Sequence, residues 1–256
     1  ILEHLIELDP DVICLEELDA PHFTQFLEPT LGSIGYKGIY QQKPGSLDGC
    51  ALFARTVKFG IESFRSVRYL AVSKEQPLSE SDGSFVVPQN QVAILADLVH
   101  VDSGRRLVVV VTHLKAEKSA LGESIRLQEA QSLLKELSTE FQDDRDFPIV
   151  IGADLNATPT SQEYAAQVYP FIEQHPLGLK SAYVNGKGAE GEPEYTTWKV
   201  RKGKESKHVI DYVFYRGALE VVSVLNMPED VDEDRIPSFR YPSDHFALIV
   251  EFEWIV

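Results

Sequence analysis

Segments with helical spacing of apolar residues alternate along the chain with short apolar runs typical of buried strands. Helical spacing is clearest over Leu121 to Phe141, where apolar residues recur every three or four positions. Shorter helices are expected at Ile1 to Leu8 and at Pro21 to Leu31. A further helix is expected to begin at Thr160, where Glu163 would complete a capping box.

Apolar runs of strand length make up most of the remaining pattern. Two of them, Gln91 to Val101 and Arg106 to His113, flank the turn residues Asp102-Ser-Gly-Arg105 and predict a β-hairpin. Strands are also expected at Asp11–Leu18, Tyr36–Tyr40, Cys50–Ala54, Pro148–Leu155, Tyr195–Val200, Val209–Arg216, Leu219–Leu225 and Phe246–Trp254. The segments Gln76–Gln89 and Tyr183–Glu194 are rich in Pro, Gly or polar residues and predict loops.

The mixed order of these elements predicts an α/β fold in layers, with two sheets packed face to face and helices outside. No repeat of fixed period and no convincing linker divides the 256 residues, so we expect one domain over 1–256. The chain opens inside the helical pattern at Ile1 without a Met, and the natural protein is therefore expected to start earlier.

Charge and cysteine content narrow the classes of partner and compartment. The chain carries 24 basic and 40 acidic residues, a formal charge of −16, which disfavours tight non-specific binding of nucleic acid. Cys14 and Cys50 lie in apolar runs and are interpreted as core residues, which favours a reducing, intracellular compartment, cytoplasmic or mitochondrial. No apolar run has the roughly 18 residues of a membrane span. We expect a monomer without membrane contact.

Polar residues stand at the ends of several apolar runs. Asp154 and Asn156 lie two positions apart, so an extended chain points both to one side, where they can address one phosphate and its metal; an Asx turn before Pro159 is the alternative. Glu17 is either a metal ligand or a residue that leaves the sheet into solvent. His113 is either a phosphate contact or a strand cap.

An acidic residue inside an apolar strand completes this set. Asp211 is flanked by Ile and by Tyr-Val-Phe, so its carboxylate needs a partner, and His245 is the candidate. Such a pair orients the imidazole and raises its basicity, which leaves Asp244 to hold metal. Carboxylates, an amide and imidazoles favour Mg²⁺, or Mn²⁺, and hydrolysis at phosphorus. The sequence contains no P-loop, dinucleotide-binding glycine pattern or Gly-x-Ser-x-Gly elbow.

Taken together, these motifs resemble the endonuclease/exonuclease/phosphatase superfamily. The resemblance covers nearly the whole chain, and it narrows to the CCR4-like deadenylase branch and, within it, to the nocturnin group. The motifs are Leu15-Glu-Glu-Leu18, Asp48-Gly-Cys-Ala-Leu-Phe53, Thr112-His-Leu-Lys-Ala116, Gly152-Ala-Asp-Leu-Asn156, Tyr195-Thr-Thr-Trp-Lys-Val-Arg201, Val209-Ile-Asp-Tyr212, Arg235-Ile-Pro-Ser-Phe239 and Tyr241-Pro-Ser-Asp-His245. The resemblance implies a four-layer α/β sandwich with two mixed, mainly antiparallel sheets and Mg²⁺-dependent phosphoester hydrolysis.

The same resemblance implies a role for each matching residue. Glu17 would bind the metal and Asp244 would complete the acidic site. Asp154 and Asn156 would position the attacking water and the phosphate, His113 would stabilise the phosphate, and Asp211 would orient His245. The implied substrate is a nucleotide such as NADP(H), cleaved at its 2′-phosphate and held by Lys43, Lys115 and Arg201. The alternatives are a 3′-to-5′ poly(A) exoribonuclease that acts on the 3′ end of RNA and releases AMP, and an inactive binding module.

The chain departs from the pattern of the family at several positions. Ala153 stands where the family has Gly, and Glu117 stands where the nocturnin group has a phosphate-binding Arg. The segment between Lys43 and Asp48 is shorter than in the family. The expected domain lacks the first strand, which in the family supplies a metal-site Asn.

Overall fold

Two β-sheets pack face to face in the computed structural model, which describes residues 1–73, 85–186, 191–201, 203–231 and 235–255. The smaller sheet has the order β1-β3-β2, with β1 (Val12–Asp19), β2 (Tyr36–Gln42) and β3 (Asp48–Arg55). The larger sheet has the order β4-β5-β6-β7-β11-β8, with β4 (Phe59–Ser73), β5 (Phe85–His100), β6 (Arg106–His113), β7 (Ile149–Asp154), β11 (Asp211–Arg216) and β8 (Lys180–Ser181). Its strands are antiparallel except for β6 and β7, which run parallel.

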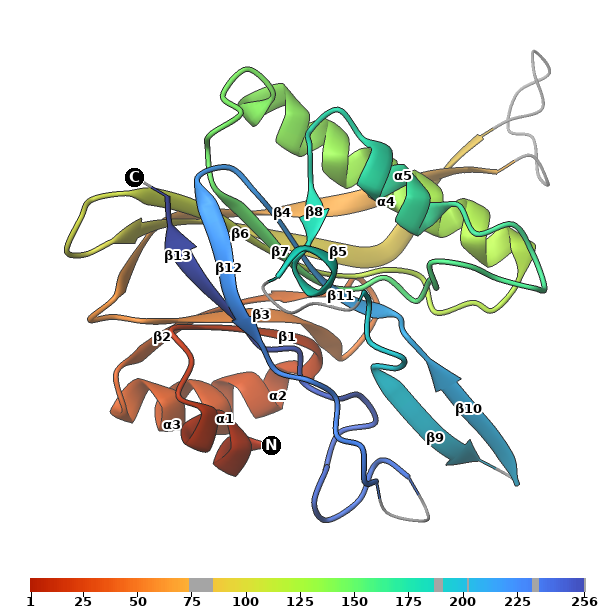
Figure 1. Ribbon diagram of the computed structural model, residues 1–256, viewed down its shortest axis with the longest axis horizontal. Coiled ribbons are helices and arrows are strands. Elements are labelled where there is room, and N and C mark those ends of the chain that lie inside the picture. Colours follow the sequence, from red (N-terminus) through yellow and green to blue (C-terminus); the bar gives the residue numbers. More distant parts are fainter. Residues whose placement is uncertain (74–84, 187–190, 202, 232–234, 256) are drawn as a thin grey trace.

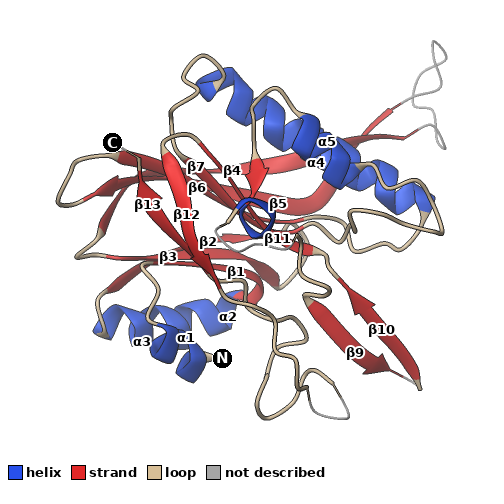
Figure 2. Ribbon diagram, viewed as in Figure 1, coloured by secondary structure: helices blue, strands red, loops and turns tan. Residues whose placement is uncertain are grey.

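Helices cover the outer face of each sheet, as Figures 1 and 2 show. The smaller sheet is covered by α1 (Leu2–Leu8), α2 (Ala20–His22), a π-helical turn (Phe23–Leu27) and α3 (Glu28–Ser33). The larger sheet is covered by α4 (Ala120–Phe141) and α5 (Val168–Gln174). The apolar residues of the two sheets meet in a central core, for example Leu52 of β3 and Ile94 of β5. The predicted four-layer α/β sandwich is therefore confirmed.

Two antiparallel ribbons and a short helix complete the fold. The pair β12 (Leu219–Val224) and β13 (Val250–Trp254) adds to the central core. The hairpin of β9 (Thr197–Arg201) and β10 (Lys204–His208) projects from the sandwich (Figure 1). The helix α6 (Ala182–Asn185) follows β8. Among the described residues, no helix combines the length and apolar character needed to cross a membrane.

The helix expected to begin at Thr160 is wrong. Residues 160–167 are not helical, and α5 begins only at Val168. The Glu123 side chain of α4 accepts hydrogen bonds from the backbone N–H groups of Gln167 and Val168, at 2.7 and 3.1 Å. The start of α5 is thus set by a carboxylate from a distant helix, which a local capping pattern does not reveal.

The two loop predictions are only partly correct. Within Gln76–Gln89, residues 74–84 lie outside the described part, and residues 85–89 belong to β5 because they continue its pairing with β4. Within Tyr183–Glu194, the first three residues lie in α6, and residues 187–190 are outside the described part. The last strand begins at Val250 rather than Phe246, because Phe246 packs against Tyr195 in a separate cluster.

Candidate active site

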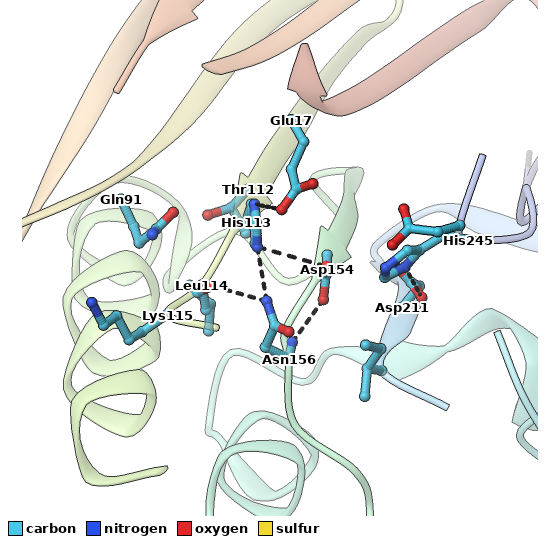
Figure 3. A network of polar contacts seen from close by, with 12 residues as sticks. Glu17, Gln91, Thr112, His113, Leu114, Lys115, Asp154, Asn156, Asp211 and His245 are labelled. Carbon is cyan, nitrogen blue, oxygen red and sulfur yellow. Dashed lines mark hydrogen bonds and ion pairs between the residues drawn. The ribbon is translucent and has the colours of Figure 1, made fainter. Parts of the chain in front are cut away.

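Strand register brings three of the predicted site residues side by side at one end of the larger sheet. Asp154, the last residue of β7, pairs with His113 at the end of β6 and with Asp211 at the start of β11. The parallel pairing of β6 and β7 makes both strands end at the same edge. Figure 3 shows Asp154 between His113 on one side and the Asp211–His245 pair on the other.

His113 is buried and held by two neighbours. Its Nδ1 lies 2.9 Å from the ammonium group of Lys43, and its Nε2 lies 2.8 Å from the side-chain amide of Asn156. Burial, followed by the charge of Lys43, lowers the pKa of His113 to about 3. The ring is therefore neutral. Because an ammonium group only donates, Nδ1 accepts from Lys43.

His245 and Asp211 form the predicted pair. Nδ1 of His245 lies 2.9 Å from Oδ2 of Asp211, and Thr196 donates from its hydroxyl group to the same carboxylate. Burial alone lowers the pKa of His245, but the hydrogen bond and charge of Asp211, together with the charge of Asp154, raise it to about 9. The imidazole is thus oriented and made more basic, which suits proton transfer.

Asp244 faces cations. Its Oδ2 lies 2.6 Å from Nζ of Lys199 and 3.0 Å from Nη2 of Arg201. Both basic residues come from β9, so the projecting hairpin is tied to the site through this carboxylate. Lys199 also places its ammonium group 3.2 Å from Nε2 of His245. The Asp244 carboxylate is therefore neutralised by the protein in this arrangement, and its predicted role as a metal ligand stays a prediction.

The carboxylates of Glu16 and Asp154 are the perturbed acids of the site. Burial and the charges of Asp211 and Asp154 raise the pKa of Glu16 to about 8. Burial and the charge of Asp211 raise the pKa of Asp154 to about 8. Acidic side chains are thus crowded in a buried place, and the charge of His245 opposes the rise in both pKa values. Ligand atoms of Asp154, Asp211 and His245 lie within 4.8 Å of one another, and the two carboxylates are hard oxygen donors that suit a divalent cation.

Glu17 and Asn156 occupy uncommon backbone conformations. Among the described residues, only four other than glycine have a positive φ, and these two are among them, at 53° and 49°. A bulge in the pairing of β1 with β3 accompanies Glu17, whose side chain is 63% exposed and lies 3.7 Å from Nδ1 of His113. The backbone N–H of Asn156 donates to the Asp154 carboxylate at 2.8 Å. Such backbone strain is common in functional sites.

The predicted substrate-binding residues differ in where they lie. Lys43 is buried, and its ammonium group pairs with Asp48 at 2.6 Å as well as with His113. Lys115 is partly exposed, on the side of His113 away from Asp211 and His245 in Figure 3. Arg201 is exposed and reaches Asp244. Lys43 therefore contributes to the site by its hydrogen bond to His113 and by lowering the pKa of that ring.

Glu117 is turned toward the helix that follows it. Its carboxylate accepts a hydrogen bond from the Ser119 hydroxyl group at 2.7 Å, at the N-terminus of α4. The neighbouring Lys118 is exposed, and its charge contributes, after burial, to the lowered pKa of His208 on the projecting hairpin. Glu117, which stands where the nocturnin group has Arg, thus makes its hydrogen bond with Ser119 of the same segment.

Two contributors to the site escaped the reasoning from sequence: Thr196 and Lys199. Thr196 is fully buried and accepts from the backbone N–H groups of Ile210 and Asp211. Thr196 and Lys199 lie in a run that was interpreted as a strand and as one of the family motifs, without a role for either residue. The polar Thr-Thr pair in a buried segment was the available signal for Thr196.

Comparison with known proteins places this site in a family. The model of the endonuclease/exonuclease/phosphatase family matches residues 1–245. Nocturnin from Mus musculus is 35% identical over 268 residues, which include 99% of this chain and 57% of the relative. The CCR4-Not complex 3′-5′-exoribonuclease subunit Ccr4 from Yarrowia lipolytica is 26% identical, over 99% of this chain and 43% of the relative. The chain thus spans less than two thirds of these curated relatives.

A solved structure agrees with the sequence comparison. The catalytic domain of human nocturnin with bound sulfate superposes with a TM-score of 0.77 and 31% identity, over 99% of this chain and 84% of that domain. Endonucleases, exonucleases and phosphatases all hydrolyse phosphoesters, and both the predicted superfamily and the resemblance to its nocturnin group are confirmed. The chain belongs to the endonuclease/exonuclease/phosphatase family.

Proposed function

We propose that this protein is a Mg²⁺-dependent phosphoester hydrolase that acts on a nucleotide. The observation that carries the proposal is the convergence of Asp154, Asp211 and His245, with ligand atoms within 4.8 Å of one another. A neutral His113 and Asn156 border this group. Acid, base and hydrogen-bond donors thus surround one position where a phosphate can lie.

The donor set supports a hard divalent cation, Mg²⁺ or Mn²⁺. Asp154 and Glu16 supply carboxylates whose pKa values are raised by burial and then by the charges of neighbouring carboxylates, and Glu17 lies at the border of the site. These residues, with Asp211, would hold the ion. A bound Mg²⁺ supplies charge neutralisation for the phosphate and for the leaving oxygen.

The remaining steps follow from side chains of the chain itself. Asp211 holds Nδ1 of His245, so Nε2 of that ring is the atom that exchanges a proton in the site. The neutral His113 and the side-chain amide of Asn156 at its Nε2 lie beside Asp154, where they can contact a phosphate oxygen. Lys199 places a positive charge beside His245, where negative charge grows as water attacks phosphorus.

The substrate we propose is NADP(H), with hydrolysis of its 2′-phosphate. Support comes from the similarity to nocturnin over nearly the whole chain and from Lys115 and Arg201, which offer positive charge beyond the phosphate position. The acidic balance of the chain also favours a small anion over a long polyanion.

The alternative is a 3′-to-5′ exoribonuclease acting on poly(A), supported by the similarity to exoribonuclease subunits. Incubation of the purified protein and Mg²⁺ with NADPH or with oligo(A) distinguishes the two, since the first releases phosphate and the second AMP. We expect phosphate from NADPH. The Asp154→Asn variant should lose activity while it remains folded. An inactive binding module would give neither product, and that result from the wild-type protein would refute both enzymatic proposals.

A further inference from the structure

The buried face of α4 carries charged side chains for which the proposed chemistry has no use. Glu123, Arg126 and Glu129 follow one another at intervals of three residues, and each is at most 1% exposed. Arg126 pairs with Glu123 at 2.9 Å. Removing charges from water costs several kcal/mol per ion unless hydrogen bonds compensate. The partners of these side chains therefore indicate what they do.

Those partners are largely backbone groups of one short segment next to the site. Nη1 of Arg126 donates to the carbonyl oxygens of Lys115 and Glu117, at 2.8 and 2.6 Å. Oε2 of Glu129 accepts from the backbone N–H of Lys115 at 2.9 Å. Two side chains, one helical turn apart, thus hold Lys115 by both its N–H and its carbonyl group.

The N-terminus of α4 also holds residues 115–119 in place. The Ser119 hydroxyl group accepts from the backbone N–H of Gly122 at 2.9 Å and caps the helix. A Cβ atom at Gly122 would lie 2.0 Å from the carbonyl oxygen of Glu117, so only glycine permits this close approach. Residues 115–119 are therefore fixed against α4 at several points.

The segment also joins the catalytic residues directly. The backbone N–H of Leu114 donates to the carbonyl oxygen of Asp154 at 2.9 Å, and its carbonyl oxygen accepts from Asn156 at 3.1 Å. Lys115 is the next residue along the chain. Within the described part of the chain its ammonium group makes no hydrogen bond or ion pair, and it lies on the side of His113 away from His245 (Figure 3).

We infer that Arg126 is a positioning residue for substrate binding. It fixes the backbone of Lys115 so that the free ammonium group meets a second anionic group of the substrate, beyond the phosphate that is cleaved. This inference rests on the proposed function and deepens it. The ligand class is a nucleotide that carries at least two phosphate groups, one at Asp154 and His245 and the other on the Lys115 side of His113.

The test compares two buried arginines: Arg126, near the N-terminus of α4, and Arg216 of β11, which contacts the C-terminal end of α4. Arg126→Lys keeps the charge opposite Glu123 but loses the fork that spans two carbonyl groups. We expect KM for NADPH to rise about 10-fold while kcat changes less than about 3-fold. The matched control is Arg216→Lys: Arg216 is 3% exposed and donates to the carbonyl oxygens of Phe141, the last residue of α4, and of Asp144 beyond it. It should leave both constants unchanged.

A double-mutant cycle separates positioning from general destabilisation. Lys115→Met alone should raise KM, and adding Arg126→Lys should raise it by less than about 2-fold more, because the charge that Arg126 positions is already gone. If Arg126→Lys raises KM by the same factor with and without Lys115→Met, the inference is overturned. Gly122→Ala provides a second test if Arg126→Lys folds poorly. It displaces the backbone of Glu117 and leaves the charged side chains of α4 unsubstituted. It should raise KM in the same way.

Hydrogen exchange provides a readout that does not depend on turnover. Amides of residues 114–119 should exchange faster in Arg126→Lys and remain unchanged there in Arg216→Lys. If the wild-type protein releases phosphate from NADPH but KM and exchange stay unchanged in Arg126→Lys, the inference is refuted and the function stands. If the wild-type protein cleaves neither NADPH nor oligo(A), the function fails. Whether Arg126 fixes the backbone of residues 114–119 is then judged from hydrogen exchange alone. Unchanged exchange in Arg126→Lys would refute that role too.

Discussion

His245 lies between Asp211 and Lys199, with Nδ1 2.9 Å from the carboxylate and Nε2 3.2 Å from the ammonium group. Asp211 raises the pKa of the ring, whereas the charge of Lys199 lowers it. Lys199 can donate to Nε2 only when the imidazole is neutral, because a protonated ring has no free lone pair. With its pKa raised to about 9, the ring is protonated near neutral pH, and then Nε2 and the Lys199 ammonium group both offer hydrogen bonds to a substrate phosphate.

Replacing Asp211 with Asn should reduce kcat/KM by roughly 10²- to 10⁴-fold, the range typical of a lost general acid–base contribution. The amide offers no charge to raise the pKa of His245, and it favours the wrong ring tautomer. An NMR titration of His245 should show a pKa below that of the wild-type ring. Asp97→Asn is the control, because Asp97 pairs with Arg106 on the same sheet but away from the site. Unchanged activity in Asp211→Asn would exclude the pair from catalysis.

Lys199→Met should raise the pKa of His245, since the nearest positive charge is removed while Asp211 remains. We expect kcat to fall by about 10-fold or more, because charge that stabilises the transition state is lost. Lys204→Met, on the exposed part of the same hairpin, should change neither quantity. A lower His245 pKa in Lys199→Met would contradict the assignment.

The crowded carboxylates predict a stability that falls as pH rises. Glu16 and Asp154 have pKa values of about 8 in the folded protein, against about 4 in an unfolded chain, and His245 is raised to about 9. The folded state therefore binds more protons above pH 6.5, and stability decreases with rising pH. The pKa of His113 is lowered to about 3, so protonation of this ring affects stability only below pH 6.5. Without divalent ions, Tm should fall by about 5 °C between pH 6.5 and 8.

Magnesium should cancel this pH dependence, because a cation favours the ionised carboxylates. Thermal melts with Mg²⁺ should show a larger rise in Tm at pH 8 than at pH 6.5. Asp154→Asn should flatten the pH profile and weaken the response to Mg²⁺. A Mg²⁺ response equal at both pH values would argue against an ion among these acids.

The sequence predicts the centre of the site well because strand register creates it. Asp154 and His113 each stand at the end of a clear apolar run, and Asp211 lies within a third run that pairs beside them. The partner of Asp211 follows from the cost of an unpaired buried charge. Lys199 does not follow in this way, because its contact with Asp244 depends on where the projecting hairpin folds back.

The charged face of α4 shows where hydrophobic periodicity stops being informative. The apolar positions of α4 predict the helix and its contact with the sheet, as Leu134 and Leu137 confirm. Glu123, Arg126 and Glu129 have the polarity of solvent-facing residues, yet they are buried by a loop that the pattern does not place. The misplaced start of α5 has the same origin, since Glu123 caps it from outside.

Glu129→Gln should stabilise the protein. The Glu129 side chain is fully buried, its Oε1 has no hydrogen-bond partner, and burial raises its pKa to about 7. The ionised form is thus penalised, and the penalty grows as pH rises from 4.5 to about 7 and is complete above that pH. Glutamine keeps an oxygen for the backbone N–H of Lys115 and removes the charge. Tm should rise by a few degrees, roughly 2–4 °C, at pH 8 and by less at pH 6, with KM unchanged. A fall in Tm at pH 8 would mean that the charge itself is needed beside Lys115 and Lys43, whose positive charges act on this carboxylate.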